Sequence, residues 1–154
     1  MDTLIRKCKA QCNILMAHPE ANGFFGAKGL AGGIPWSYSL IAQKFMTQLN
    51  SCGQGNRINL YEYLRKGWTY HAKGYYPPNR KYPYMTLVGS PNFGERSVKR
   101  DLESQLCIVT ENEDLRKELH DECTRLYKMG IPAETERPVP VWISPFVSLF
   151  RSYY

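Results

Sequence analysis

The stretch "WTYHAKGYYPPNRKYPYMTLVGSPNFGERSVKRDLES", residues 68–104, carries the patterns from which the fold of this 154-residue chain is best inferred. The segments "GWTYHAK" (67–73) and "YMTLVGS" (84–90) are both expected to be β-strands. Residues 77–83 contain three prolines and are expected to join the two strands as an extended hairpin loop. Side chains two apart on a strand share a face, so the prediction places His71 and Lys73 on one face of the first strand.

Further strands and two helices are predicted on either side of this hairpin. The strands are "CNILMAHP" (12–19), "RINLYEYL" (57–64) and "ESQLCIVT" (103–110). One helix is predicted over residues 36–50, and a second from Thr110 to about Met129, opened by a capping box of Thr110 and Glu113. Strands and helices interleave along the chain. We therefore predict a single α/β domain over residues 1–154, with a mixed β-sheet flanked by helices.

The apolar positions of the two predicted helices recur at helical spacing, which gives each helix one face for packing. In the first helix these positions are Ile41, Phe45 and Leu49, and in the second they are Leu115, Leu119, Cys123 and Leu126.

Composition and charge limit the classes of partner. The chain is 43% hydrophobic and 22% charged, as in globular proteins, and no apolar run approaches the ~18 residues of a membrane-spanning helix. Its net charge of +6 favours an anionic partner, such as nucleic acid, a phosphorylated metabolite or an acidic lipid surface. Five cysteines without paired spacing predict free thiols, and no metal site is expected.

Two segments outside the hairpin are of functional interest. The glycine-rich "EANGFFGAKGLAGGIP" (20–35) is expected to form a loop, and its spacing does not match a P-loop. Lys28 in this loop is a weak candidate contact for an anionic substrate. The apolar tail, residues 139–154, is expected either to dock on the domain or to lie at a membrane interface, and we favour docking.

The polar residues of the hairpin region form a candidate site. His71 and Lys73 share a predicted strand, Ser90 and Asn92 follow the partner strand, and Glu103 begins the next one. An imidazole acts as a nucleophile or a general acid near neutral pH, and a carboxylate fixes its tautomer. Lysine and amide donors stabilise phosphoryl oxygens. These groups are the ones that phosphoryl transfer through a histidine requires.

The motifs H-A-K (71–73), G-S-P-N (89–92), R-S (96–97) and D-L-E (101–103) resemble the second H-x-K motif of the phospholipase D superfamily. With "ANGFFGAKGLAGGIP", "GWTYHAKG" and "IVTEN", nearly the whole chain is similar to the C-terminal half of the mitochondrial phosphatidylglycerophosphate synthase family. One position departs from the superfamily pattern, because Pro78 stands where an aspartate is usual.

The resemblance implies an enzyme that transfers the phosphatidyl group of CDP-diacylglycerol to sn-glycerol 3-phosphate through a phosphohistidine, without a metal or other cofactor. It implies that His71 is the acid and base, Lys73 binds phosphate, Ser90 and Asn92 donate to its oxygens, and Glu103 supports a histidine. Arg96 and Arg100 are weaker substrate-binding candidates, as is Lys28. The family also implies association with the mitochondrial inner membrane, although the first residues contain no recognisable targeting signal.

A phospholipase D site is built from two His-Lys-Asn sets, and this sequence contains one. His18 has no lysine two residues later, and His120 lies among charged residues of a predicted helix. We therefore interpret the chain as a half-enzyme that needs an N-terminal half with the first motif. A homodimeric nuclease or phosphodiesterase acting on nucleic acid is the second alternative. A noncatalytic lipid-binding fragment is the third.

Overall fold

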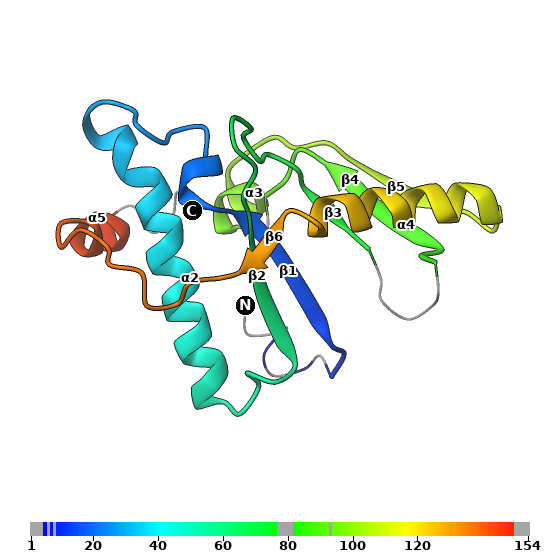
Figure 1. Ribbon diagram of the computed structural model, residues 1–154, viewed down its shortest axis with the longest axis horizontal. Helices are drawn as coiled ribbons and strands as arrows, with labels where there is room; N and C mark the ends of the chain where they lie inside the picture. Colours follow the sequence, from blue (N-terminus) through cyan, green and yellow to red (C-terminus); the bar gives the residue numbers. More distant parts are fainter. Residues whose placement is uncertain (1–4, 6, 8, 77–81, 93, 150–154) are drawn as a thin grey trace. The chain divides into compact units, whose positions relative to one another are not determined.

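The structure is a computed structural model that describes residues 5, 7, 9–76, 82–92 and 94–149 (Figure 1). The chain divides into two compact units. Unit 1 comprises Met1–His71 and Met129–Ser148, and unit 2 comprises Ala72–Lys128 and Leu149–Tyr154. The predicted α/β class is confirmed. The prediction of one mixed sheet was incomplete, because each unit has its own three-stranded sheet.

The sheet of unit 1 is mixed and has the strand order β1-β2-β6. Strands β1 (Cys12–Ala17) and β2 (Ile58–Tyr63) are parallel and lie in register from Cys12 opposite Ile58 to Ala17 opposite Tyr63. The short strand β6 (Gly130–Pro132) pairs antiparallel with β2. Both long strands confirm the sequence prediction. Strand β6 was not predicted, because three residues are too few to show a periodic pattern.

Helix α2 (Ile34–Ser51) connects the two parallel strands and supplies much of the unit 1 core. It begins with a proline in its first turn, where the missing N–H costs nothing. The predicted apolar stripe is confirmed at Phe45 and Leu49, which are buried with Ile5 and Ile58. Packing of α2 against β2 therefore forms the centre of this core.

The glycine-rich segment of unit 1 is partly ordered into two short 3-10 helices, η1 (Pro19–Ala21) and η2 (Gly29–Gly33), with a loop between them. Near the end of this glycine-rich segment, Gly33 lies against Trp142 and against Ile143, the first residue of helix α5 (Ile143–Leu149). A Cβ at Gly33 would lie 2.4 Å from the Trp142 ring. Ile143 and Val147 are buried, so the described part of the apolar tail docks on unit 1 as we favoured.

The sheet of unit 2 is antiparallel, with the order β3-β4-β5. Its strands are β3 (Gly74–Tyr75), β4 (Met85–Gly89) and β5 (Gln105–Val109). The second predicted hairpin strand is confirmed as β4, which pairs with β3 through Gly74 opposite Val88. Residues 77–81, which include Pro78, lie outside the described residues, so most of the predicted proline-rich loop does too.

The prediction of a strand over residues 67–73 is wrong. Only Gly74–Tyr75 pair as β3, and residues 67–73 are not strand. The reason is that backbone donors in this segment bond elsewhere: the Tyr70 N–H donates to the carbonyl of Ala21 at 2.8 Å, rather than to a neighbouring strand. The argument that a regular strand aligns His71 with Lys73 is therefore wrong.

Two helices complete unit 2, α3 (Glu95–Lys99) and α4 (Glu113–Tyr127). The predicted capping box is wrong, because the N-cap of α4 is Asn112, whose side chain accepts a hydrogen bond from the N–H of Leu115 at 2.9 Å. The Thr110 hydroxyl instead accepts from the N–H of Asn112. No helix within the described ranges is long and apolar enough to cross a membrane.

Candidate active site

His71 is exposed and is the last residue of unit 1 before the chain enters unit 2. Its neighbour Tyr70 is fixed twice within unit 1. The Tyr70 ring stacks on the buried Tyr63, with centroids 4.7 Å apart, and its N–H bonds to Ala21. The backbone leading to the imidazole is therefore anchored to the end of β2 and to η1.

Lys73 and Glu103 interact within unit 2. Burial lowers the pKa of the Lys73 ammonium from its ordinary value of 10.5, and the Glu103 carboxylate opposes that shift. Both side chains are half-buried. The Lys73 carbonyl also accepts a hydrogen bond from the N–H of Gly89, at 3.4 Å, which ties the residue to the end of β4. A partly desolvated ammonium near a carboxylate is suited to binding an oxyanion.

The Gly-Ser pair at residues 89–90 has a structural explanation. A Cβ at Gly89 would lie 2.4 Å from the Ser104 carbonyl oxygen, so β4 and β5 approach too closely for any other residue. The Ser90 N–H donates to that same carbonyl at 2.9 Å. The Ser90 Oγ accepts from the Ser104 N–H at 3.0 Å and donates to the Ser104 carbonyl at 3.3 Å. This pairing positions the residue before Ser104, which is Glu103.

The remaining hairpin candidates lie around α3. The Asn92 N–H donates to the hydroxyl of Ser97 at 3.0 Å, and the Asn92 side chain is exposed. Arg96 forms a 2.9 Å ion pair with Asp101, whereas Arg100 is exposed at the C-cap of α3. Arg96 is thus held by a carboxylate within the same segment.

Of the other two histidines and Lys28, His18 and Lys28 belong to unit 1 and His120 belongs to unit 2. Lys28 is the exposed N-cap residue of η2 in unit 1. His18 follows β1, and its Nδ1 accepts from the N–H of Glu20 at 3.2 Å. His120 packs edge-on against Tyr82, with centroids 5.4 Å apart, and is half-buried. Its partial burial on α4 comes from a contact that the helical pattern did not predict.

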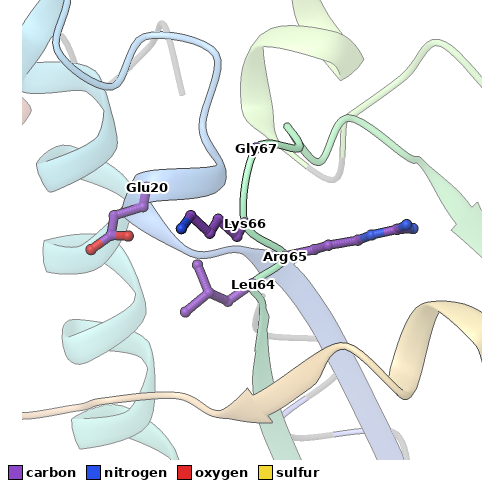
Figure 2. Close-up of a pocket in the computed structure, with 5 residues that line it drawn as sticks. All are labelled: Glu20, Leu64, Arg65, Lys66 and Gly67. Carbon is purple, nitrogen blue, oxygen red and sulfur yellow. The ribbon is translucent and has the colours of Figure 1, made fainter.

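Unit 1 contains a pocket of about 370 Å³ that was not predicted from the sequence. Figure 2 shows the residues that line it, which are Glu20, Leu64, Arg65, Lys66 and Gly67. Lys66 extends toward the same side as Glu20, whereas Arg65 extends the opposite way (Figure 2). The Arg65 guanidinium lies 3.9 Å from the ring centroid of Trp68. One signal in the sequence could have predicted this pocket: Arg65 and Lys66 directly follow the predicted strand at residues 57–64. α/β sheets often bind ligands at the carboxyl ends of their parallel strands.

A buried ion pair in unit 1 was also missed. Arg137 donates from both Nη atoms to the Glu62 carboxylate, at 2.8 and 2.6 Å, and its carbonyl accepts from the Gln43 side chain at 2.7 Å. Hydrogen bonding to Glu62 raises the pKa of Arg137. The pair connects the segment after β6 to β2 and α2. Two charges 75 residues apart give no local signal in the sequence.

Among the residues that the structure describes, no group of three or more His, Cys, Asp or Glu side chains could hold a metal ion. The described cysteines, at positions 12, 52, 107 and 123, are free thiols.

The fold matches that of a phospholipid-synthesising enzyme. A crystal structure of phosphatidylserine synthase from Haemophilus influenzae Rd KW20 aligns with a TM-score of 0.75, covering 98% of this chain and 35% of that one. Sequence identity is 19%, so the likeness concerns the fold alone. No protein-family model matches the sequence.

Sequence relatives define the family more closely. The chain is 45% identical over 159 residues to the mitochondrial CDP-diacylglycerol--glycerol-3-phosphate 3-phosphatidyltransferase of Homo sapiens. It is 38% identical to a probable enzyme of that name from Dictyostelium discoideum and 34% identical to the one from Saccharomyces cerevisiae. The comparisons cover 98%, 97% and 82% of this chain, respectively. The chain is a homologue of these phosphatidyltransferases, as the motifs at residues 68–104 indicated, and it spans under a third of the relatives' length.

Proposed function

We propose that this chain contributes half of the active site of an enzyme that transfers a phosphatidyl group from CDP-diacylglycerol to sn-glycerol 3-phosphate. The products are phosphatidylglycerophosphate and CMP. The observation that carries the proposal is the 45% identity over 98% of the chain to an enzyme named for that reaction. The compared length includes the H-A-K and G-S-P-N motifs.

The reaction proceeds in two displacements at one phosphorus. A histidine from a first motif attacks the phosphorus next to the diacylglycerol, forming a P–N bond as the P–O bond to CMP breaks. His71 gives a proton to the departing CMP oxygen. His71 then takes the proton of the glycerol 3-phosphate hydroxyl, which attacks the same phosphorus, forming a P–O bond and releasing the histidine.

The other hairpin residues bind and orient the phosphoryl group in this proposal. Lys73 offers a partly desolvated ammonium to its oxygens, held near Glu103. Asn92 has an exposed carboxamide that can donate to the same oxygens. Ser90 fastens β4 to β5, and donates to substrate only if its bond to Ser104 opens. Glu103 supports a histidine, as the family resemblance implies.

The second His-Lys-Asn set comes from outside these 154 residues, because the sequence contains one H-x-K motif with a following G-S-P-N. We assign this second set to an N-terminal half of the enzyme. The alternative source is a second copy of this chain. The site works at a mitochondrial inner-membrane surface, in keeping with the mitochondrial names of the relatives and the net charge of +6.

Incorporation of labelled glycerol 3-phosphate into lipid tests the proposal, using the chain combined with a polypeptide that carries a first H-x-K motif. His71→Ala should abolish product, and His120→Ala should retain it because His120 packs on Tyr82 in unit 2. Equal activity of the two variants would contradict the proposal. Phosphodiester cleavage of nucleic acid by a homodimer of this chain, with no lipid product, would favour a nuclease instead.

A further inference from the structure

The loop between η1 and η2, together with the start of η2, presents apolar side chains to solvent. Phe24, Phe25 and Leu30 are 49%, 50% and 65% exposed. The Phe24 N–H donates to the Asn22 side chain and the Phe25 N–H to the Asn22 carbonyl, both at 2.9 Å. The two rings are therefore held out by a hydrogen-bonded turn. We call Asn22–Leu30 the aromatic loop.

The glycines of the aromatic loop have open space beside their Cα atoms. A Cβ added at Gly23, Gly26 or Gly29 would meet no atom within 4 Å. Gly26 and Gly29 adopt φ values of 75° and 65°, which other residues rarely adopt. The turn also satisfies backbone donors internally, since the Ala27 N–H donates to the Phe24 carbonyl at 3.0 Å. Satisfied donors lower the cost of placing a loop in an apolar medium.

We propose that the aromatic loop inserts into the surface of a bilayer containing anionic phospholipids. Exposed aromatic rings gain free energy by moving from water into the interfacial region. The exposed Lys28 is the only charged residue between positions 21 and 34, so the loop carries a positive charge and no negative one. An ammonium beside inserted rings is attracted to anionic headgroups. Exposed rings beside a single positive charge therefore complement the apolar and anionic layers of such a bilayer surface.

The loop is connected to His71 by a specific hydrogen bond. Ala21, which precedes the aromatic loop, accepts from the N–H of Tyr70, the residue before His71. Stacking of Tyr70 on the buried Tyr63 fixes this connection within unit 1. Insertion of the loop would therefore bring the segment that carries His71 close to the membrane surface. This last step rests on the proposed function, whereas membrane insertion itself does not.

Sedimentation with phosphatidylcholine vesicles, with and without phosphatidylserine, measures the insertion. Neither lipid is a substrate or product of the proposed reaction. The double variant Phe24→Ser/Phe25→Ser should bind mixed vesicles about tenfold to a hundredfold more weakly, because two half-exposed rings are removed. Lys28→Gln should weaken binding to mixed vesicles about fivefold and leave binding to pure phosphatidylcholine unchanged.

A matched control removes equal numbers of exposed apolar side chains elsewhere. Val98 and Leu106 are 82% and 69% exposed in unit 2, and Val98→Ser/Leu106→Ser should bind vesicles as the unchanged chain does. Depth is read from Phe25→Trp, whose added fluorescence should be quenched by brominated acyl chains. Quenching no greater than that of the unchanged chain would overturn insertion.

Two further results would overturn the proposal. One is equal vesicle binding by the unchanged chain and the Phe24→Ser/Phe25→Ser variant. The other is a dimer that forms without lipid and is lost in this variant, while vesicle binding stays the same. In that case the loop would bind a second copy of the chain instead of a membrane. His71→Ala should bind vesicles normally, so loss of transfer and loss of insertion are separately observable.

Discussion

Ser90 and Ser104 hydrogen-bond through both main chain and side chain, with the Ser90 Oγ accepting at 3.0 Å and donating at 3.3 Å. The serine of the G-S-P-N motif therefore extends the β4–β5 ladder by one residue beyond Gly89 opposite Gln105. Its hydroxyl proton is already directed at a carbonyl. We infer from this relationship that Ser90 positions Glu103.

Replacing Ser90 tests that role through stability. Ser90→Ala should lower the free energy of unfolding by about 1 kcal/mol, because exposed hydrogen bonds are lost but water can replace them. Ser90→Thr keeps the hydroxyl and should restore most of the stability. Ser51→Ala, which removes one bond at the end of α2, serves as the control in chemical denaturation. A Ser90→Ala variant as stable as the unchanged chain would contradict the fastening role.

The Lys73–Glu103 interaction predicts a pKa change. Burial lowers the pKa of Lys73 and the Glu103 charge raises it, so Glu103→Gln should lower the Lys73 pKa further. Titration of the lysine side chain by ¹³C NMR measures this shift. Glu111→Gln, an exposed change in the same unit, should leave it unaltered. An unchanged or higher Lys73 pKa in Glu103→Gln would show that the two groups do not interact.

The lowered pKa of Lys73 predicts the direction in which stability changes with pH. Folding lowers the pKa of Lys73 below 10.5, so the folded state binds fewer protons than the unfolded state between the folded pKa and 10.5. The contribution of Lys73 to stability should therefore increase as pH rises through that window. Comparing unfolding of the unchanged chain with Lys73→Met across the window isolates it. A contribution that decreases with pH would contradict the burial of the ammonium.

The buried Glu62–Arg137 pair predicts a large loss of stability when its arginine is replaced. Arg137→Met leaves the buried Glu62 carboxylate without its partner and should cost about 3–5 kcal/mol of stability. The double variant Glu62→Gln/Arg137→Met removes the stranded charge and should recover part of that loss. Arg125→Met, which breaks an exposed pair with Glu122, should cost under about 1 kcal/mol. Equal costs for the two arginines would contradict the difference in burial.

Local patterns predicted the elements that contain enough residues to be periodic. Phe45 and Leu49 marked the buried face of α2, and β1, β2, β4 and β5 followed from apolar runs. Failures arose where a distant partner decides the structure. Residues 67–73 have a strand-like composition, but the Tyr70 N–H bonds to Ala21, 49 residues earlier. Strand β6 and the Glu62–Arg137 pair likewise depend on partners that are remote in sequence.

The motifs of the candidate site indicated a family, but they did not indicate how the groups of the site are arranged. The motifs at residues 71–73 and 89–92 indicated the family to which the relatives belong. They did not indicate that Ser90 is engaged with Ser104, or that Lys73 is the charged neighbour of Glu103. Spacing identifies which groups are present, whereas hydrogen bonds and burial decide which of them are available to substrate.

The most direct test of the half-site is to find which polypeptide becomes labelled by CDP-diacylglycerol carrying ³²P in its phosphatidyl group, without glycerol 3-phosphate. The chain is mixed with a polypeptide carrying a first H-x-K motif. We expect label on that polypeptide, none on this chain, and slower labelling and release with His71→Ala. Label on His71, or labelling unaffected by His71→Ala, would contradict the assignment of His71 as the acid and base.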